Sequence, residues 1–449
     1  MGDIRGLTWA NCPIICLDAG EDLTCLGRKT PHTCLLHADS PAPNESVIKL
    51  KQMEEKVQTI KSRVVGLDAH SEKLVLCIME KHSSGNAALA KVLRTITCTV
   101  TKLEETFKKH TSKADEIILE ASTNSFSIVS RLRLINRNAF VIKSESVSGI
   151  ARKDRITDEI DAENIARLWL SGFAKIVWVP DENIRTLRDI FFGYRNTTKD
   201  RTRTSNRIWA FCSGHGFKLP VRSRKKKVAD VKEQVLSLKW TQTEKFHIEH
   251  LILCYERACE DRDSYLSQIN KIVSSDPDMI KMMQILGIRT ITAFSLKAFI
   301  GDISRFPSPK KLVSYIGLNP RVCGSGKYEA TRSLSVFGRR DLKAILIECA
   351  QSALRTGKDS VHRWARKLSV LKGEKKAVVA LARKMLTYLW HVLMGHPCPS
   401  VSAPQGYEAK LVKLSSSIGN KYIKSLGFEK SSEWIIHVLK SQNFIIQKT

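Results

Sequence analysis

The feature that most constrains the fold is a regular alternation of short apolar runs and helical segments between about residues 62 and 215. The runs "RVVGLDAH", "KLVLCIMEK", "EIILEAS", "AFVIKS" and "KIVWVP" have the length and content of strands, and the first two are expected to form a hairpin. Helices are expected over 87–109, at "SIVSRLRLIN" and after Thr157. Strands interleaved with helices predict a mixed α/β sheet covered on both faces.

Composition narrows the partners of the chain. Its 449 residues suffice for about two or three domains, and 43% hydrophobic residues fit a globular protein. Lys and Arg total 73 against 45 Asp and Glu, a formal charge of +28, which favours nucleic acid as the partner. A membrane is not expected, because no apolar run reaches spanning length. The scattered cysteines and the lack of a secretory signal indicate a reduced, cytoplasmic protein.

Residues 1–60 differ from the rest of the chain and are predicted to be a poorly ordered extension. They contain cysteines and histidines that are candidate zinc ligands, namely Cys12, Cys16, Cys25, Cys34, His32 and His37. The extension remains the preferred interpretation, because these residues contain no CxxC pair and their spacings fit no familiar zinc finger. Met53 lies just before the first convincing domain and is an alternative start.

The stretch from 183 to 209 is predicted to be a basic helix that contacts nucleic acid. Tyr194 and Trp209 are interleaved with its arginines, which are Arg185, Arg188, Arg195, Arg201, Arg203 and Arg207. Basic side chains on a rigid helix can follow a phosphate backbone, and aromatic rings can stack on bases. The cluster "RSRKKK", residues 222–227, follows as a basic linker.

Residues 228–275 are predicted to form one long helix with a heptad seam. The seam consists of Ile248, Ile252, Tyr255, Cys259, Arg262, Leu266, Ile269 and Val273. It indicates a coiled coil or a helical hairpin, and because such a seam needs a partner helix it favours dimerisation. A mainly helical domain is expected over 276–400, beginning with a pattern like that of helix-hairpin-helix DNA binders, and 401–449 is a tail without an interpretable pattern.

Four acidic residues are candidate metal ligands. Asp158 and Asp161 are three positions apart on one face of a helix, where they could also be ordinary first-turn acids capped by Thr157. Asp68 and Glu120 end two of the predicted strands. Four convergent carboxylates need cations to neutralise them, and oxygen ligands suit Mg²⁺ or Mn²⁺. Two such ions about 4 Å apart would clamp a phosphodiester.

A second candidate centre lies in "GSGK", residues 324–327. Ser325 stands between two glycines and is a possible nucleophile. Cationic side chains follow that could hold phosphate, namely Lys327, Arg332, Arg339 and Arg340. The spacing is not that of a Walker loop, and a Gly-Ser turn that only touches the DNA backbone is an equal alternative.

An ordered set of motifs between about residues 62 and 395 resembles the DEDD-type transposases of the insertion-sequence 110 family, in their 1111-like branch. The motifs are "GLDAHSEKL", "ILEAS", "TDEIDAENIA", "LGIRTITA", "YIGLNP", "GSGK", "FGRRDL" and "KKAVVALARKML". The resemblance implies an RNase-H-like, RuvC-like domain over 61–215, a basic linker and coiled coil over 216–275, and a transposase domain over 276–400.

The same resemblance implies the chemistry. Asp68, Glu120, Asp158 and Asp161 would hold Mg²⁺ or Mn²⁺, and Ser325 would attack DNA to form a covalent phosphoserine link. A structured bridge RNA would guide the enzyme to element ends and target DNA. Homodimers would assemble into tetramers in a prokaryotic cytoplasm, associated with the nucleoid.

Three functions stay open at this point. The first is the RNA-guided recombinase. The second is a metal-only nuclease of the Holliday-junction type, in which Ser325 merely binds phosphate, and Ser325→Ala would separate it from the first. The third is a non-catalytic nucleic-acid-binding remnant, which the intact four acids and serine disfavour.

Overall fold

The computed structural model describes residues 63–82, 84, 87–143, 157–217, 228, 232–325, 328–335, 337–396 and 404–442. Over 322–333 only the backbone is described. The predicted extension 1–60 and the basic cluster 222–227 lie outside these ranges.

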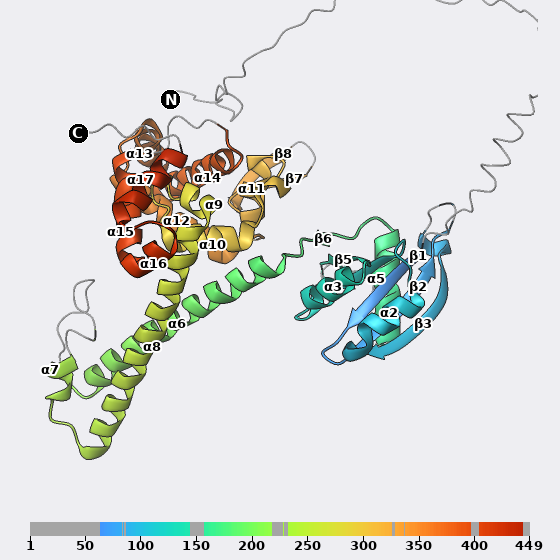
Figure 1. Ribbon diagram of the computed structural model, residues 1–449, viewed down its shortest axis with the longest axis horizontal. Coiled ribbons are helices and arrows are strands. Elements are labelled where there is room, and N and C mark those ends of the chain that lie inside the picture. Colours follow the sequence, from blue (N-terminus) through green and yellow to red (C-terminus); the bar gives the residue numbers. More distant parts are fainter. Residues whose placement is uncertain are drawn as a thin grey trace, which may run out of the picture. The chain divides into compact units, whose positions relative to one another are not determined.

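A six-stranded sheet forms the first region, in the order β3-β2-β1-β4-β5-β6 (Figure 1). The strands are β1 Arg63–Ala69, β2 Lys73–Glu80, β3 Lys91–Thr99, β4 Glu116–Glu120, β5 Asn138–Ile142 and β6 Ile176–Val177. β1, β2 and β3 pair antiparallel, β4 is parallel to both β1 and β5, and β6 is antiparallel to β5. The predicted β1–β2 hairpin is confirmed.

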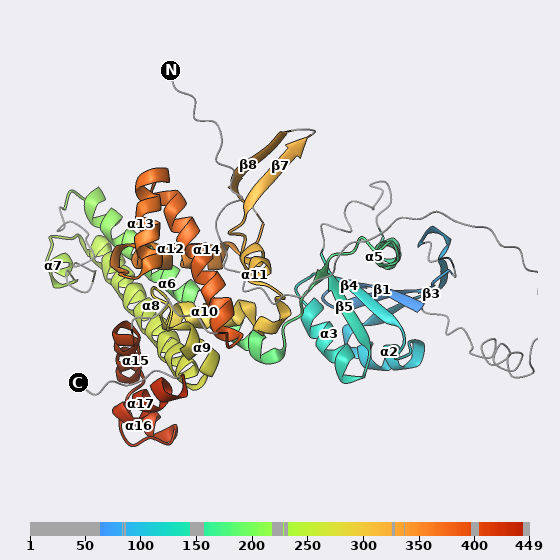
Figure 2. The same cartoon turned by 90° about the horizontal axis from the view of Figure 1, so that it is seen from above.

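Helices cover both faces of this sheet, as Figure 2 shows. α2 (Leu103–His110) and α3 (Ser125–Leu134) pack on one face against apolar side chains of β1, β2, β4 and β5. α5 (Asp158–Leu170) packs on the other face against the alternate residues of the same strands. Successive strand residues point to opposite faces, so both sets are buried and the strands are apolar throughout. The predicted mixed α/β sheet is confirmed.

The helix expected over 87–109 is wrong in its first part. A short 3-10 turn, η1 (Ala87–Leu89), precedes the edge strand β3, and a second, η2 (Val100–Lys102), leads into α2. β3 carries the sequence "KVLRTITCT", whose β-branched side chains lose rotamer freedom in a helix and fit a pleated surface. Pairing with β2 provides hydrogen-bond partners for the β3 backbone along one edge.

A long helical hairpin follows the sheet. α6 (Glu182–Gly214) and α8 (Gln242–Ser275) lie side by side in Figures 1 and 2, with the short α7 (Lys232–Leu236) near the turn. The single helix predicted over 228–275 is wrong at its start. Thr241 accepts a hydrogen bond from the Glu244 backbone while the Glu244 side chain accepts one from the Thr241 N–H, a capping box that begins the helix.

The heptad seam of α8 finds its partner within the same chain. Ile248 and Ile252 are buried with Ile208 and Cys212 of α6, while Ile269 and Val273 join a core that includes Phe191 of α6. Of the two predicted arrangements, the helical hairpin is therefore the one present in the described chain. Both ends of the seam are thus buried within the chain, and dimerisation stays a prediction.

The remaining elements form a mainly helical bundle, as predicted. They are α9 Pro277–Met282, α10 Thr290–Ile300, η4 Ile303–Arg305, α11 Pro309–Ile316, the β7–β8 hairpin (Pro320–Ser325 and Tyr328–Leu334), α12 Arg340–Thr356, α13 Ser360–Lys372 and α14 Glu374–Leu393. Gly287, at φ +88°, makes the turn between α9 and α10, the helix–Gly turn–helix pattern expected from sequence. α10 is almost wholly buried and so serves as the core of the bundle.

The C-terminal segment has more structure than its sequence indicated. α15 (Pro404–Ile418), α16 (Asn420–Ser425) and α17 (Ser431–Ser441) contribute to the main core of the bundle. Lys410 donates to the backbone carbonyls of Met283 and Ile285, at 2.6 and 2.8 Å. These contacts fix the segment to the turn after α9.

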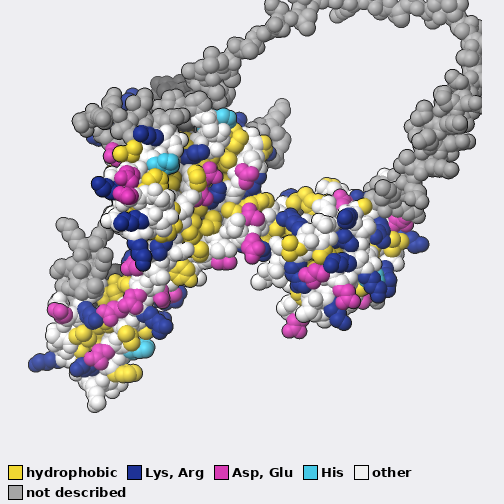
Figure 3. Space-filling model, in the orientation of Figure 1, with side chains coloured by type: hydrophobic (Ala, Val, Ile, Leu, Met, Phe, Trp, Pro, Cys, Tyr) yellow, Lys and Arg dark blue, Asp and Glu magenta, His cyan; other side chains and the backbone are white. Residues whose placement is uncertain are grey.

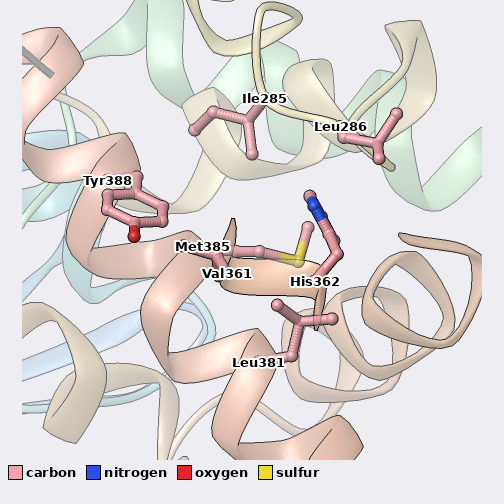
Figure 4. Close-up of a pocket in the computed structure, with 7 residues that line it drawn as sticks. All are labelled: Ile285, Leu286, Val361, His362, Leu381, Met385 and Tyr388. Carbon is pink, nitrogen blue, oxygen red and sulfur yellow. The ribbon is translucent and has the colours of Figure 1, made fainter. Parts of the chain in front are cut away.

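A small pocket lies between α13, α14 and the residues that follow α9 (Figure 4). Apolar side chains form most of its wall, with the His362 ring and Tyr388 beside them. Burial lowers the pKa of His362, which favours the neutral imidazole. The lining contains no carboxylate, so this pocket is unsuited to binding a divalent cation. Within the described ranges, none of the helices combines the length and the apolar character needed to cross a membrane.

Candidate active site

An unusually close approach of α5 to β1 creates the candidate site. A Cβ at Gly66 would lie 1.9 Å from the Ala162 carbonyl oxygen and 2.9 Å from the Ala166 nitrogen, so only glycine fits here. From Gly66 to Asp68 the strand advances two residues, about 6.6 Å. From Ala162 back to Asp158 the helix covers four residues, about 6 Å. The two aspartates therefore come together at the same end of the contact.

Asp68 and Asp158 are joined by a histidine that lies between them. Nε2 of His70 is 3.1 Å from Oδ2 of Asp68 and 3.3 Å from Oδ1 of Asp158. Lys73 Nζ lies 2.7 Å from the other Asp158 oxygen. Asp68, His70 and Asp158 each offer a ligand atom within 4.8 Å of the other two, which makes them a group that could hold a metal ion.

Glu120 and Asp161 border this group without belonging to it. The parallel pairing of β1 and β4 runs to Leu67 and Leu119, and the next residues along the two strands are Asp68 and Glu120. Adjacent strands lie about 4.8 Å apart, and paired residues face the same side of the sheet. Asp161 is close enough to raise the pKa of Asp68 through like charge. The structure thus brings Asp68 and Asp158 together, with Asp161 close enough to act on Asp68, while Glu120 stands at the end of the neighbouring strand β4.

The two central carboxylates differ in their electrostatic state. Burial, and then the neighbouring charges of Asp158 and Asp161, raise the pKa of Asp68, although His70 opposes the shift. The hydrogen bond from Lys73 lowers the pKa of Asp158. Asp158 and Asp161 also lie in the first turn of α5. Thr157 caps this helix by accepting a hydrogen bond from the Ile160 N–H at 3.4 Å. Helix capping and metal binding are therefore compatible at this position.

Sequence reasoning missed the basic side chains of the site. It assumed that the repulsion between the acids needed a metal ion, whereas His70 and Lys73 already stand against Asp158. The available signal was the alternation in "GLDAH": residues 66, 68 and 70 share one face of an extended segment. The backbone fixes this turn, because the His70 carbonyl accepts from Asn124 at 2.7 Å and its N–H donates to the Lys73 carbonyl at 3.0 Å.

The proposed nucleophile belongs to the β7–β8 hairpin. Ser325 is the last residue of β7 and pairs with Tyr328, the first residue of β8. Lys327 lies outside the described residues, and Arg332 is described by its backbone in β8 alone. Arg339 stacks on the Phe299 ring at 4.0 Å, while Arg340 is exposed at the start of α12.

The arginines of α6 divide into internal and external ones. Arg188 donates to the Ala298 carbonyl at 2.9 Å and lies over the rings of Trp178 and Phe299, so its guanidinium is used within the protein. Arg185 and Arg201 are half-buried. Arg195 is likewise half-buried, whereas Arg203 and Arg207 are exposed, and the side chains of Arg195 and Arg203 have acidic partners in Asp341 and Asp200.

Charges of both signs are mixed on one face of the molecule. On the face drawn in Figure 3, Lys and Arg side chains are interspersed with Asp and Glu over the described elements. Among the described residues on this face, a strong single-sign patch does not appear.

Comparison with known proteins agrees with this architecture. Residues 65–214 match the transposase family with the DEDD domain of IS110, and residues 280–365 match the "Transposase IS116/IS110/IS902 family". The protein y4qE of Sinorhizobium fredii, named as a transposase, is 24% identical over 360 residues, which are 73% of this chain and 87% of that protein. The transposase for insertion sequence element IS1111A of Coxiella burnetii is 31% identical over 132 residues, 29% of this chain and 36% of that protein. The transposase for insertion sequence element IS1328 of Yersinia enterocolitica is 19% identical over 335 residues, which are 73% of this chain and 96% of that protein.

The fold and the acidic site, taken with these matches, define a DNA-processing enzyme of the transposase class. Its first matched region contains the sheet with α5 and α6, and the second contains α10 to α12 and the β7–β8 hairpin. The chain belongs to the IS110 family of DEDD transposases.

Proposed function

We propose that this transposase cuts and rejoins DNA strands with a divalent-metal centre at Asp68, Glu120, Asp158 and Asp161 and with Ser325 as the nucleophile. The observation that carries the proposal is the convergence of Asp68 and Asp158, which are 90 positions apart in the sequence, at one end of the β1–α5 contact. Two further acids border them on the same side of the sheet.

The residues present fit a divalent cation. For metal–ligand bonds of about 2.1 Å, neighbouring ligand atoms of an octahedral ion lie about 3.0 Å apart. The separations of 3.1 and 3.3 Å across Asp68, His70 and Asp158 are close to that value. A bound Mg²⁺ or Mn²⁺ would supply Lewis-acid stabilisation of the charge that develops on the phosphoryl oxygens. DEDD transposases are typically dependent on divalent metals, which supports this assignment.

The side chains of the chain have separate tasks in this scheme. Asp68 is partly buried at the end of β1, beside β4, and would anchor the cation there. Lys73 is paired with Asp158 and would have to release that oxygen when the cation binds. The raised pKa of Asp68 means that protons compete with the cation for this carboxylate more than for an ordinary aspartate.

Ser325 would form the covalent link to DNA. Its Oγ would bond to phosphorus while a DNA oxygen departs, and the serine proton would pass to that departing oxygen. The number of phosphate ester bonds is unchanged, so rejoining would need no external energy source. The position of Ser325 at the end of β7, with arginines following it in sequence, supports this role.

The partners form part of the same proposal. The net charge of +28 and the solvent-accessible arginines of α6 support DNA and a structured guide RNA as ligands. Assembly of homodimers into tetramers rests on the family resemblance, because the α8 seam is already occupied by α6.

A covalent-capture assay tests the function. The full chain is incubated with element-end DNA, RNA from its flanking region and Mg²⁺, and resolved on denaturing gels with and without protease. We expect a protease-sensitive DNA band with wild type and with the control Ser213→Ala, an exposed serine of α6. The band should be absent with Ser325→Ala and with Asp68→Asn. DNA cleavage that survives Ser325→Ala without any such band would contradict the serine mechanism and indicate a metal-only nuclease.

A further inference from the structure

We propose that His70 is a protein ligand of the metal centre, and that this nitrogen ligand makes the site prefer Mn²⁺ over Mg²⁺. The inference rests on the proposed function, which places the cation at Asp68 and Asp158. It adds a residue outside the four acids and gives the centre a mixed nitrogen and oxygen donor set.

The first support is the geometry of the imidazole. Nε2 lies 3.1 Å from an Asp68 oxygen and 3.3 Å from an Asp158 oxygen, so one ring nitrogen faces both carboxylates. A histidine that merely paired with one acid would not need to stand between two. The three ligand atoms lie within 4.8 Å of one another, as neighbouring or opposite positions around one ion require.

The second support is that the backbone holds His70 in this place. β1 ends at Ala69, and His70 follows at once with its Nε2 facing the Asp68 and Asp158 carboxylates. The His70 carbonyl accepts from the Asn124 amide at 2.7 Å, which ties the turn after β1 to the segment after β4. The His70 N–H also donates to the Lys73 carbonyl at 3.0 Å. These two bonds fix the backbone from which the imidazole extends toward the two carboxylates.

The donor set then determines which ion is preferred. Mg²⁺ favours an all-oxygen environment and gives up its waters reluctantly, whereas imidazole suits transition ions. Mn²⁺ accepts carboxylate ligands and lies in the series whose affinity for nitrogen exceeds that of Mg²⁺. His70 should therefore strengthen Mn²⁺ binding and leave Mg²⁺ binding nearly unchanged.

Electron paramagnetic resonance of Mn²⁺ bound to the full, untagged chain tests this directly. Loss of the free Mn²⁺ signal gives the affinity, and electron spin-echo modulation from ¹⁴N reports an imidazole in the coordination shell. The variants are His70→Gln, Asp68→Asn and the control His82→Gln, a histidine after β2 whose ring contacts Ser84.

We expect ¹⁴N modulation in wild type and in His82→Gln, and its loss in His70→Gln. His70→Gln should weaken Mn²⁺ binding about ten- to a hundredfold and Mg²⁺ binding less than about twofold. Mn²⁺ bound in an Asp68-dependent manner without ¹⁴N modulation, or with modulation that persists in His70→Gln, would overturn the ligand assignment and leave the metal centre intact. Failure of wild type to bind Mn²⁺ at all would overturn both this inference and the proposed function.

Discussion

Replacing Gly66 by alanine is expected to force α5 away from β1 and to take the acidic site apart. The new Cβ would lie 1.9 Å from the Ala162 carbonyl oxygen, 3.0 Å from its carbon and 2.9 Å from the Ala166 nitrogen. An ordinary carbon–oxygen contact is about 3.3 Å, so the helix must retreat by about 1.4 Å. All three obstructing atoms belong to the backbone, which cannot rotate out of the way as a side chain can.

The size of the effect follows from this clash. Overpacking a core costs typically about 1–3 kcal/mol, and we place this substitution near the upper limit of about 3 kcal/mol. The unfolding midpoint should fall by about 6–12 °C. The same retreat would carry Asp158 away from the His70 nitrogen, now 3.3 Å distant, so the affinity for Mn²⁺ should fall at least about tenfold.

Scanning calorimetry and Mn²⁺ titration on the full chain measure both effects. Gly214→Ala is the matched control, because a Cβ at Gly214, the last residue of α6, meets nothing within 4 Å. That variant should be as stable as wild type or more stable by about 0.5–1 kcal/mol. A Gly66→Ala protein with an unfolding midpoint within about 1 °C of wild type and unchanged Mn²⁺ affinity would refute the close packing of α5 on β1.

Further predictions concern charged side chains. Lys73→Met removes the cation that competes for Asp158, and isothermal titration should show Mg²⁺ affinity raised about two- to fivefold; a loss of affinity would contradict this. Burial lowers the pKa of Lys410 to about 8. Between about pH 8 and 10.5 the unfolded chain therefore keeps a proton on Lys410 that the folded chain has lost. Stability relative to Lys410→Met should therefore rise between about pH 8 and 10.5, by up to about 3 kcal/mol in denaturant titrations, and a flat difference would be the contrary result. Arg203→Gln combined with Arg207→Gln should weaken DNA binding and reduce its salt dependence without moving the unfolding midpoint, whereas Arg188→Gln should lower the midpoint because its guanidinium is used internally. The reverse pattern in filter-binding and melting experiments would mean that the internal and external arginines are wrongly assigned.

The sequence was sufficient for the parts of the fold that repeat a simple pattern. Buried strands are short apolar runs, so β1, β2, β4 and β5 were predictable, and the acids at their ends followed from strand direction. β3 was missed although its β-branched residues favour a strand, because an exposed edge strand lacks the continuous apolar run by which the buried strands were found. The capping box at Thr241 and Glu244 was visible in the sequence, but the predicted helix was begun at residue 228, before this box.

Other features depend on contacts that no local pattern contains. The partner of the α8 seam is α6, and that choice depends on how the chain turns back after residue 214. The approach of Ala162 to Gly66 joins segments almost a hundred residues apart, and Gly and Ala are too common in any chain to mark such a contact by themselves. His70 could have been found from its alternation with Asp68, whereas the role of Lys73 required the packing of α5.

The central claim is that a divalent cation binds where β1 meets the first turn of α5. Anomalous diffraction from crystals of the full chain grown with Mn²⁺ tests it most directly. The account predicts an anomalous peak about 2.1–2.2 Å from carboxylate oxygens of both Asp68 and Asp158. Anomalous peaks confined to other parts of the protein, with these two carboxylates still bonded to His70 and Lys73 at saturating Mn²⁺, would contradict it.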